Sequence, residues 1–238
     1  MNILGRLFKR EQGVGITEGV DPSIFETWEL WEQDWSRTRI NRIWSEKVKS
    51  RAWRRDPAYR LVAEYCAKYG HTVLDIGCGG GIQYAAIHEF CPSIDYTGVD
   101  ITPKMLDAAR SLFPSVKFGW GDAAELQYAD GQFDVTILRH VLEHHPLSNG
   151  QKILHEALRV ARNATLILFF TEPQDMEENI IVKQSKSGFY LNTYSTGWLE
   201  REIESVTSGR YSLETISIPK VEGSPALSDQ VLWVIEKG

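Results

Sequence analysis

Short apolar segments alternate with amphipathic segments between residues 72 and 170 of this 238-residue chain. The apolar segments predict strands, at 72–76, 96–99, 116–120, 133–138 and 165–170. The amphipathic segments between them predict helices, at 81–90, 102–113 and 149–161. A further helix at 197–206 and two β-rich runs at 211–219 and 230–236 follow. This order predicts an α/β fold, a doubly wound, mostly parallel seven-stranded sheet with helices on both faces.

The stretch before the first predicted strand has a helical period. Trp28, Trp31 and Trp35 share one helix face, and the apolar stripe continues to about residue 49. A second helix is expected at 59–69, after a proline that interrupts the pattern. The fold class therefore includes an N-terminal helical extension.

These periods divide the chain into three regions. Residues 1–22 contain four glycines and no sustained period, so we expect a flexible arm. Residues 23–70 form the N-terminal helical cap segment, and residues 71–238 form the sheet domain. Within that domain the polar stretch 171–195 is expected to be an inserted loop or lid.

Composition and cysteine content exclude several classes of protein. Hydrophobic residues make up 42% of the chain, yet no apolar run is longer than the one at 166–170, which is far shorter than the ~20 residues of a membrane-spanning helix. No secretory leader is evident, so we expect a cytoplasmic protein. Cys66, Cys78 and Cys91 cannot form a disulfide framework and lack the spacing of a zinc site, so no metal is expected.

Charge is unevenly distributed along the chain. The formal net charge is −6, but residues 35–60 carry nine Lys or Arg against two acids. Three interpretations of this basic segment stay open: a solvated helix, a cover over an anionic or sugar-derived small substrate, and a nucleic-acid surface. No zinc module or RNA-binding signature accompanies the segment, so the nucleic-acid interpretation is the weakest of the three.

Three acids follow three successive predicted strands. Asp75 precedes a glycine-rich turn, Asp100 ends the second strand, and Asp122 follows the third. A carboxylate under a glycine turn, such as Asp75, repels a pyrophosphate but suits an ammonium group. A carboxylate at the end of the second strand, such as Asp100, suits ribose hydroxyls. The third carboxylate, that of Asp122, can accept a hydrogen bond from an adenine amino group. Each acid alone could be a helix cap or a turn residue. The D-x-G-x-G-x-G spacing differs from the dinucleotide fingerprint G-x-G-x-x-G, and no phosphate-loop lysine follows.

Four segments resemble the class I S-adenosylmethionine-dependent methyltransferases, of the small-molecule type. They are VLDIGCGGG, YTGVDITPKMLDAAR, GDAAEL and FDVTILRHVLEHH. The resemblance implies that S-adenosyl-L-methionine is the cofactor. Arg162-Asn163-Ala164 departs from the Pro-Gly-Gly that relatives often carry before the fifth strand, which changes a turn and no chemical group.

The resemblance also implies roles for the residues that match these motifs. The residues at the methionine end of the cofactor would be Asp75, Gly77, Cys78 and Gly79. Those near its ribose and adenine would be Asp100, Ile101, Met105, Asp122 and Ala123. Arg139 would lie beside the sulfonium.

Residues outside the cofactor motifs are candidates for the acceptor site. His140, His144 and His145 follow the fourth strand and are candidate general bases, since imidazole accepts protons near neutral pH; each could equally have a packing or capping role. Tyr190, Asn192 and Tyr194 are candidate substrate contacts at the rim of the site. The acceptor itself is not evident in the sequence.

The sequence therefore predicts an enzyme that methylates a small molecule, on oxygen more readily than on nitrogen or carbon. A methyltransferase for nucleic acids or nucleotides is the alternative within enzymes. A catalytically silent scaffold that retains the cofactor fold is the alternative outside them, and the three intact acids argue against it. Oligomeric state has no signature in these residues.

Overall fold

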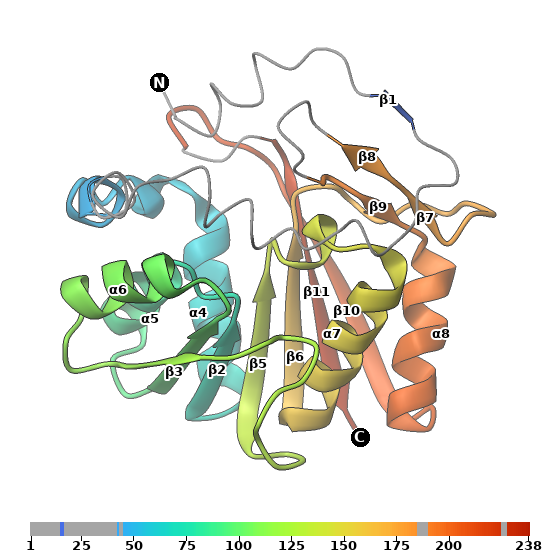
Figure 1. Cartoon of the computed structure of the whole chain (residues 1–238), viewed down its shortest axis with the longest axis horizontal. Coiled ribbons are helices and arrows are strands. Elements are labelled where there is room, and N and C mark those ends of the chain that lie inside the picture. The colour runs from blue at the N-terminus through green and yellow to red at the C-terminus, as the bar shows by residue number, and fades with distance from the viewer. Residues whose placement is uncertain (1–14, 17–41, 43–44, 185–189, 225–227) are drawn as a thin grey trace.

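The computed structural model describes residues 15–16, 42, 45–184, 190–224 and 228–238. Among these residues, seven strands form one sheet in the order β10-β11-β6-β5-β2-β3-β4 (Figure 1). Their bounds are Thr72–Ile76 for β2, Asp95–Asp100 for β3, Lys117–Trp120 for β4, Phe133–Arg139 for β5, Ala161–Phe169 for β6, Tyr211–Ile218 for β10 and Gln230–Lys237 for β11. The pairs among β4, β3, β2, β5 and β6 are parallel, whereas β11 is antiparallel to both β6 and β10. The predicted fold class is confirmed.

Helices cover both faces of the sheet. On one face lie α4 (Pro57–Tyr69), α5 (Ile82–Phe90) and α6 (Pro103–Leu112), whose buried side chains form one core cluster with β2, β3 and β5. On the other face lie α7 (Leu147–Val160) and α8 (Thr196–Thr207), which pack in a second cluster with β5, β6 and β11. Figure 1 shows the two groups on opposite sides of the strands. Two short 3-10 helices, Ala52–Arg55 (η2) and Leu142–His144 (η3), precede α4 and α7.

Helix α4 begins two residues earlier than its apolar period predicts. Asp56 is its N-cap, and the Asp56 carboxylate accepts from the Ala58 N–H at 3.0 Å. Pro57 is the first helical residue, a position where the absent N–H of proline costs nothing. The proline therefore starts this helix, as Pro103 starts α6 after Thr102.

The sheet brings the predicted binding residues to one edge. Strand β2 lies between β5 and β3, and Asp75 pairs in register with Ile137 on one side and Gly98 on the other. The chain moves outward from β2 in both directions, so β2 and β5 flank the topological switch point. Ligands of open α/β sheets bind at such a point, beyond the carboxyl ends of the strands.

The described residues of the 171–195 stretch include short strands as well as loop. It contains the two-residue strands β7 (Ile180–Ile181), β8 (Lys183–Gln184) and β9 (Thr193–Tyr194). Strand β8 pairs with β1 (Gly15–Ile16), a segment of the predicted flexible arm. Its role as a lid stays a prediction.

Much of the predicted N-terminal helix lies outside the described residues. Trp28, Trp31 and Trp35 are among the undescribed residues, while residues 45–49 are helical as expected. Helix α4, assigned by sequence to the cap segment, buries Ala58, Val62, Ala63 and Cys66 in the same cluster as the sheet. The division at residue 70 stays a prediction, but α4 is part of the main core.

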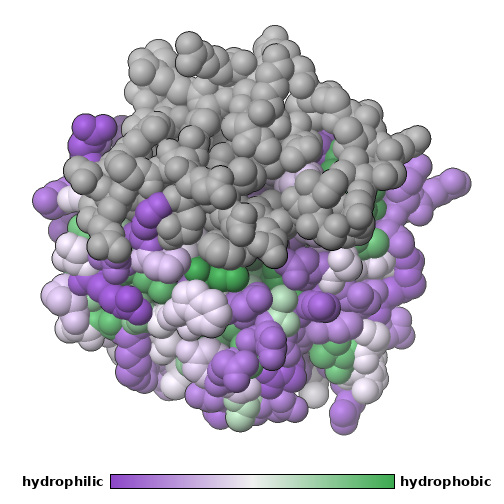
Figure 2. Space-filling model, in the orientation of Figure 1, coloured by the Kyte–Doolittle hydropathy of each residue, from purple (hydrophilic) through white to green (hydrophobic). Residues whose placement is uncertain are grey.

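The described surface is mostly polar. Figure 2 shows hydrophilic residues over most of the visible described surface, with hydrophobic residues in small separate areas. Trp120, at the end of β4, is 63% exposed, and its indole N–H donates to the Ile101 carbonyl at 3.0 Å. None of the helices in the described ranges has the length and apolar character needed to span a bilayer.

Candidate active site

The turn after β2 is built from glycines. Gly77, Gly79 and Gly81 all have positive φ, at 74°, 53° and 78°, a region that side chains with a Cβ disfavour. A Cβ on Gly77 would lie 2.7 Å from Cγ2 of Val141, so this position also lacks room for one. The Gly77 and Cys78 amides both donate to the Val99 carbonyl, at 2.8 and 3.0 Å, which holds the turn against the end of β3. Gly77 is exposed and Gly79 is half-buried, so a ligand can reach the backbone of this turn.

Asp100 connects this turn to the start of α6. One carboxylate oxygen accepts from the Gly79 N–H at 2.9 Å and the other from the Thr102 N–H at 2.8 Å. Burial raises the pKa of Asp100, and these backbone hydrogen bonds oppose that shift. Asp100 is half-buried, and each carboxylate oxygen retains a second lone-pair direction. It can therefore accept hydrogen bonds from two hydroxyl groups of a ligand.

Asp75 lies beneath the turn and is 1% exposed. The Tyr96 hydroxyl donates to Oδ2 at 2.5 Å, and Oδ1 has no hydrogen-bond partner among the described residues. Burial raises the pKa of Asp75 to about 7, with the Tyr96 hydrogen bond and Arg139 acting in the opposite direction. A buried carboxylate oxygen without a partner suits an ammonium group, directly or through water.

The residues predicted for the adenosine end follow the next strand ends. Ile101 and Met105 lie just beyond β3, with Met105 buried in the first turn of α6. Asp122 follows β4 and accepts from the Ala124 N–H at 2.8 Å. Ala123 is half-buried and packs against the α7 core cluster. The structure brings these four residues to the same edge as Asp100.

Arg139, the last residue of β5, belongs to a buried polar network. Its guanidinium lies 3.4 Å from the ring centroid of Tyr59, a cation–π contact. Nη1 donates to Gln83 Oε1 at 2.9 Å, and Nη2 lies 3.4 Å from Asp56 Oδ2. Burial and the charge of Arg139 lower the pKa of Lys47 to about 8. Lys47 and Arg139 are therefore close enough for their positive charges to interact.

His140 follows Arg139 in a strained backbone conformation. Its φ is 53°, which costs a non-glycine residue about 1–2 kcal/mol and is found often at functional sites. Its ring makes an edge contact with Phe170 at 4.6 Å between centroids, and Nε2 lies 3.0 Å from Gln230 Oε1. Burial, followed by the charges of Arg139 and His144, holds the pKa of His140 well below 6.5. The imidazole is therefore neutral at physiological pH.

The other two histidines have a ring nitrogen engaged with the protein. Nδ1 of His144 lies 2.7 Å from the Tyr190 carbonyl, so Nδ1 carries the hydrogen and donates it. Nδ1 of His145 lies 2.9 Å from the Asn149 amide nitrogen, which donates to it. Burial and His144 lower the pKa of His145 to about 3. The lone pair of His145 is thus already occupied by a hydrogen bond.

We expect His145 to make folding stability sensitive to acid. Its folded-state pKa is below the ordinary 6.5, so the unfolded chain binds the additional proton and stability falls as pH decreases from 6.5 towards 3. Urea unfolding of the native protein and of His145→Gln at pH 7.5 and 5.0 measures this. The native protein should lose more stability than the variant, by up to about 1.4 kcal/mol per pH unit. Equal losses in the two proteins would contradict the expectation.

The three predicted substrate contacts lie in the interior and not at a rim. Tyr194 is 1% exposed, and its hydroxyl donates to the carbonyls of Leu142 and His145, at 3.1 and 2.8 Å. Asn192 is fully buried and donates to the same His145 carbonyl at 2.7 Å. Tyr190 is 3% exposed. All three support the segment that carries the histidines, and contact with an acceptor stays a prediction.

Four polar residues of the site were not identified from the sequence. Asp56 could have been found, because an acid before a proline and a helical pattern is an N-cap signal. Glu143 is fully buried, accepts from the Phe170 N–H at 2.8 Å, and has its pKa raised to about 7 by burial. Glu143 lies within the VLEH segment, but the contact of its side chain from η3 to Phe170, directly after β6, could be found only from the fold. No pattern in the sequence indicates that Gln83 and Gln230 belong to the site.

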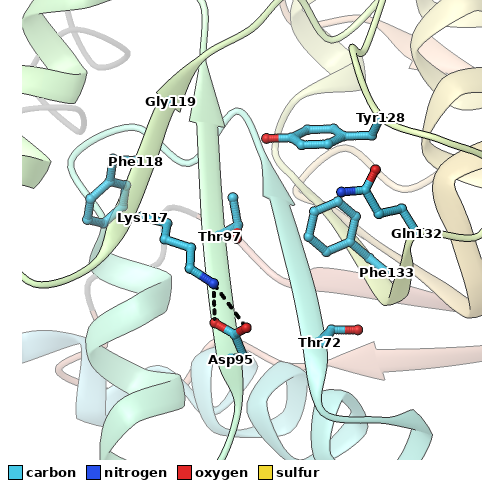
Figure 3. A pocket seen from close by; sticks show the side chains of 9 residues that line it. All are labelled: Thr72, Asp95, Thr97, Lys117, Phe118, Gly119, Tyr128, Gln132 and Phe133. Carbon is cyan, nitrogen blue, oxygen red and sulfur yellow. Dashed lines mark hydrogen bonds and ion pairs between the residues drawn. The ribbon is translucent and has the colours of Figure 1, made fainter.

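A groove of about 480 Å³ lies elsewhere on the sheet (Figure 3). Thr72, Asp95 and Lys117 from the beginnings of β2, β3 and β4 line it, together with Tyr128 and Gln132. Lys117 and Asp95 form an ion pair at 3.0 Å. The groove lies towards the amino ends of these strands, so it is separate from the site at their carboxyl ends. Across the described part of the chain, no three His, Cys, Asp or Glu side chains cluster as metal ligands.

Comparison with known proteins finds methyltransferases. A family profile described as a methyltransferase domain matches residues 73–164. A demethylmenaquinone methyltransferase from Beutenbergia cavernae is 30% identical over 187 residues, which cover 77% of this chain and 72% of that protein. Ajmaline N-methyltransferase from Rauvolfia serpentina is 32% identical over 111 residues, 44% of this chain. That match spans only 37% of the length of the Rauvolfia protein.

A solved structure shares the fold over nearly the whole chain. It is 1,6-didemethyltoxoflavin-N1-methyltransferase from Burkholderia thailandensis, solved with bound 1,6-didemethyltoxoflavin and S-adenosylhomocysteine. The superposition has a TM-score of 0.66 and covers 94% of each chain at 14% sequence identity.

Proposed function

The chain belongs to the class I S-adenosylmethionine-dependent methyltransferases and uses S-adenosylmethionine, and from this premise we propose that it methylates an oxygen atom of a small anionic acceptor. The observation that carries the choice of oxygen is His140, a neutral and half-buried imidazole directly after β5, the strand that pairs with β2 before the glycine turn. A hydroxyl acceptor must lose a proton as it is methylated, and a neutral imidazole can receive one.

We assign the cofactor to the carboxyl ends of β2, β3 and β4. Asp75, Gly77, Cys78 and Gly79 would hold its methionine end, in agreement with the unpaired Asp75 Oδ1 and the open glycine backbone. Asp100 and Ile101 would hold the ribose, and Met105, Asp122 and Ala123 would contact the adenosine portion. When bound, this cofactor supplies a methyl group on a positively charged sulfur.

Arg139 suits an anion better than it suits a sulfonium. A guanidinium repels a positive sulfur, whereas it binds carboxylates strongly. Two of its N–H groups have partners in Gln83 and Asp56, and Arg139 has further N–H donors. The methionine carboxylate of the cofactor is negative and belongs to the same portion as the sulfonium. We therefore propose that Arg139 binds the cofactor through that carboxylate.

The proposal of an anionic acceptor is supported by Lys47 more than by the rest of the basic segment. Arg54 pairs with Glu89 and Arg60 with Glu64, and both arginines are exposed. Lys47 is instead half-buried and close enough to Arg139 for their charges to interact. At pH 7 most Lys47 side chains are still protonated and can attract a carboxylate or phosphate. Sugar-derived acceptors that carry such a group remain within this proposal.

Transfer of a labelled methyl group tests the acceptor class. Purified protein is incubated with methyl-labelled S-adenosylmethionine and, separately, with a cell extract passed through a 3 kDa filter, with total RNA, and with extracted protein. We expect label in the small-molecule fraction only. When this fraction is separated by ion exchange, the label should elute with the anionic molecules. Label in RNA would favour the nucleic-acid alternative, and transfer to no fraction would favour the silent scaffold.

We expect methyl transfer to be independent of metal ions. The acids at the ends of β2, β3 and β4 are assigned to the cofactor, and the residues that the structure describes contain no separate set that could chelate an acceptor through a divalent ion. Turnover should therefore be unchanged after treatment with EDTA and desalting. Loss of turnover that magnesium restores would contradict this assignment.

A further inference from the structure

Two buried polar side chains from distant parts of the sequence form a hydrogen-bonded chain that leads to His140. Nε2 of His140 lies 3.0 Å from Gln230 Oε1, and Gln230 Nε2 lies 3.0 Å from Asp56 Oδ1. Gln230 and Asp56 are each 3% exposed. Because β11 runs antiparallel to β6, its first residue, Gln230, lies at the edge where β5 and β6 end. Neither Gln230 nor Asp56 is needed to bind the cofactor in the proposed function.

The hydrogen-bond partners determine the orientation of the Gln230 amide. Asp56 Oδ1 also accepts from the Ala58 N–H, and Oδ2 faces Arg139, so the carboxylate acts only as an acceptor. The NH2 group of Gln230 must therefore face Asp56, and its carbonyl oxygen must face His140. A carbonyl oxygen cannot donate, so Nε2 must donate to it and the hydrogen of the neutral imidazole is on Nε2. Nδ1 then carries the lone pair.

Nδ1 of His140 differs from the corresponding atom of His145. Asn149 donates to Nδ1 of His145, whereas Nδ1 of His140 has no hydrogen bond to any described residue. The His140 ring is held by the edge contact with Phe170, by the Gln230 hydrogen bond, and by a backbone amide that donates to the Leu168 carbonyl at 2.9 Å. The charged or titratable groups that affect it are Arg139 and His144. The ring is thus fixed, with one unengaged acceptor nitrogen.

We propose that Gln230, itself oriented by Asp56, is a positioning residue that keeps the hydrogen on Nε2 of His140 and leaves Nδ1 to receive the proton of the acceptor. This inference rests on the proposed function, in which His140 is the base. The acceptor hydroxyl loses its proton to Nδ1 as its oxygen forms a bond to the methyl carbon. The sulfur–carbon bond breaks and the sulfur keeps the electron pair. The positive charge lost by sulfur appears on the imidazolium, which still donates through Nε2 to Gln230.

Gln230→Met tests the proposal, because methionine has a similar length but no amide. The matched control is Gln151→Met on α7, where the native amide donates to Glu202 of α8 at 2.9 Å and not to a residue of the His140 network. Nitrogen-15 NMR of the histidine rings identifies which nitrogen carries the hydrogen. We expect the Nε2–H form for His140 in the native protein and in Gln151→Met, and a mixture of both tautomers in Gln230→Met. S-adenosylhomocysteine binding should change less than threefold in both variants, which shows that they are folded.

A second variant separates a general packing defect from a change in hydrogen bonding. Gln230→Glu retains an acceptor for Nε2–H but replaces the amide that donates to Asp56 with a carboxyl group, which must share a proton with Asp56. The Nε2–H form of His140 should therefore be kept in this variant. A native His140 protonated on Nδ1, or an unchanged tautomer in Gln230→Met, would overturn the proposal.

The consequence for catalysis is read from label transfer into the small-molecule extract. Gln230→Met should lower the rate 10- to 100-fold at saturating cofactor, and Gln151→Met should not. A shifted tautomer with an unchanged rate would overturn the role of Nδ1. If the native protein transferred no label, the proposed function would fail, whereas the ring-nitrogen signals would still decide whether Gln230 sets the tautomer.

Discussion

Replacing Asp100 with Ala should weaken binding of S-adenosylhomocysteine by about 1.5–3 kcal/mol, which is roughly a 10- to 150-fold rise in Kd. In this variant the ribose hydroxyls of the ligand would lose the carboxylate that accepts their hydrogen bonds. The Gly79 and Thr102 amides would lose the same acceptor. Isothermal titration calorimetry measures both proteins directly. NAD+ should bind neither protein, because Asp75 beneath the glycine turn disfavours a pyrophosphate.

Asp95→Ala is the matched control for this measurement. Asp95 begins the same strand, is exposed, and pairs with Lys117 on the surface. Its removal should leave the Kd within a factor of two. An unchanged Kd in a folded Asp100→Ala protein would remove Asp100 from the cofactor site, and NAD+ binding alone would remove the assignment of the whole turn.

Replacing Asp56 with Ala should lower the free energy of unfolding by about 3 kcal/mol, near the lower end of the cost of breaking a buried ion pair. Three groups lose their acceptor in this variant: the Ala58 N–H at the start of α4, the Gln230 amide, and Arg139, which is 11% exposed. The loss of the helix cap alone costs about 1 kcal/mol. Urea denaturation monitored by circular dichroism gives the change.

Asp56→Asn distinguishes the contribution of the helix cap to stability from the contribution of the Asp56 charge. Asparagine can still accept from the Ala58 N–H, so this variant should lose less stability than Asp56→Ala while Arg139 still lacks a negative partner. Asp95→Ala again serves as the surface control, with an expected loss below about 1 kcal/mol. A loss below 1 kcal/mol for Asp56→Ala would show that the network around Arg139 contributes little to folding.

The strands and the cofactor turn could be predicted because their signals are local. Residues 72–76 are an apolar run of strand length, and the observed strand has the same bounds. The three glycines of the turn lie within five residues of one another, and their positive φ values follow from that close spacing of glycines. Strand β6 begins four residues earlier than predicted, at Ala161, because pairing with Phe133 of β5 extends it through polar residues.

The network behind the turn could not be predicted because its members are distant in sequence. Asp56 and Arg139 are separated by 83 residues, and Asp56 and Gln230 by 174. Their proximity follows from the sheet order, which places the start of β11 at the carboxyl edge beside β6. For the same reason the burial of Asn192 and Tyr194 needed the structure, since a polar stretch with aromatic residues resembles a surface loop.

A crystal structure of the protein with S-adenosylhomocysteine tests the central claim most directly. We predict that the ribose hydroxyls lie within hydrogen-bond distance of the Asp100 carboxylate, with the methionine portion along Gly77–Gly79 and its carboxylate on Arg139. His140 should face the sulfur with Nδ1 towards the space for the acceptor. Density for the ligand in another place, such as the groove lined by Asp95 and Lys117, or a ribose away from Asp100, would contradict the assignment of the site.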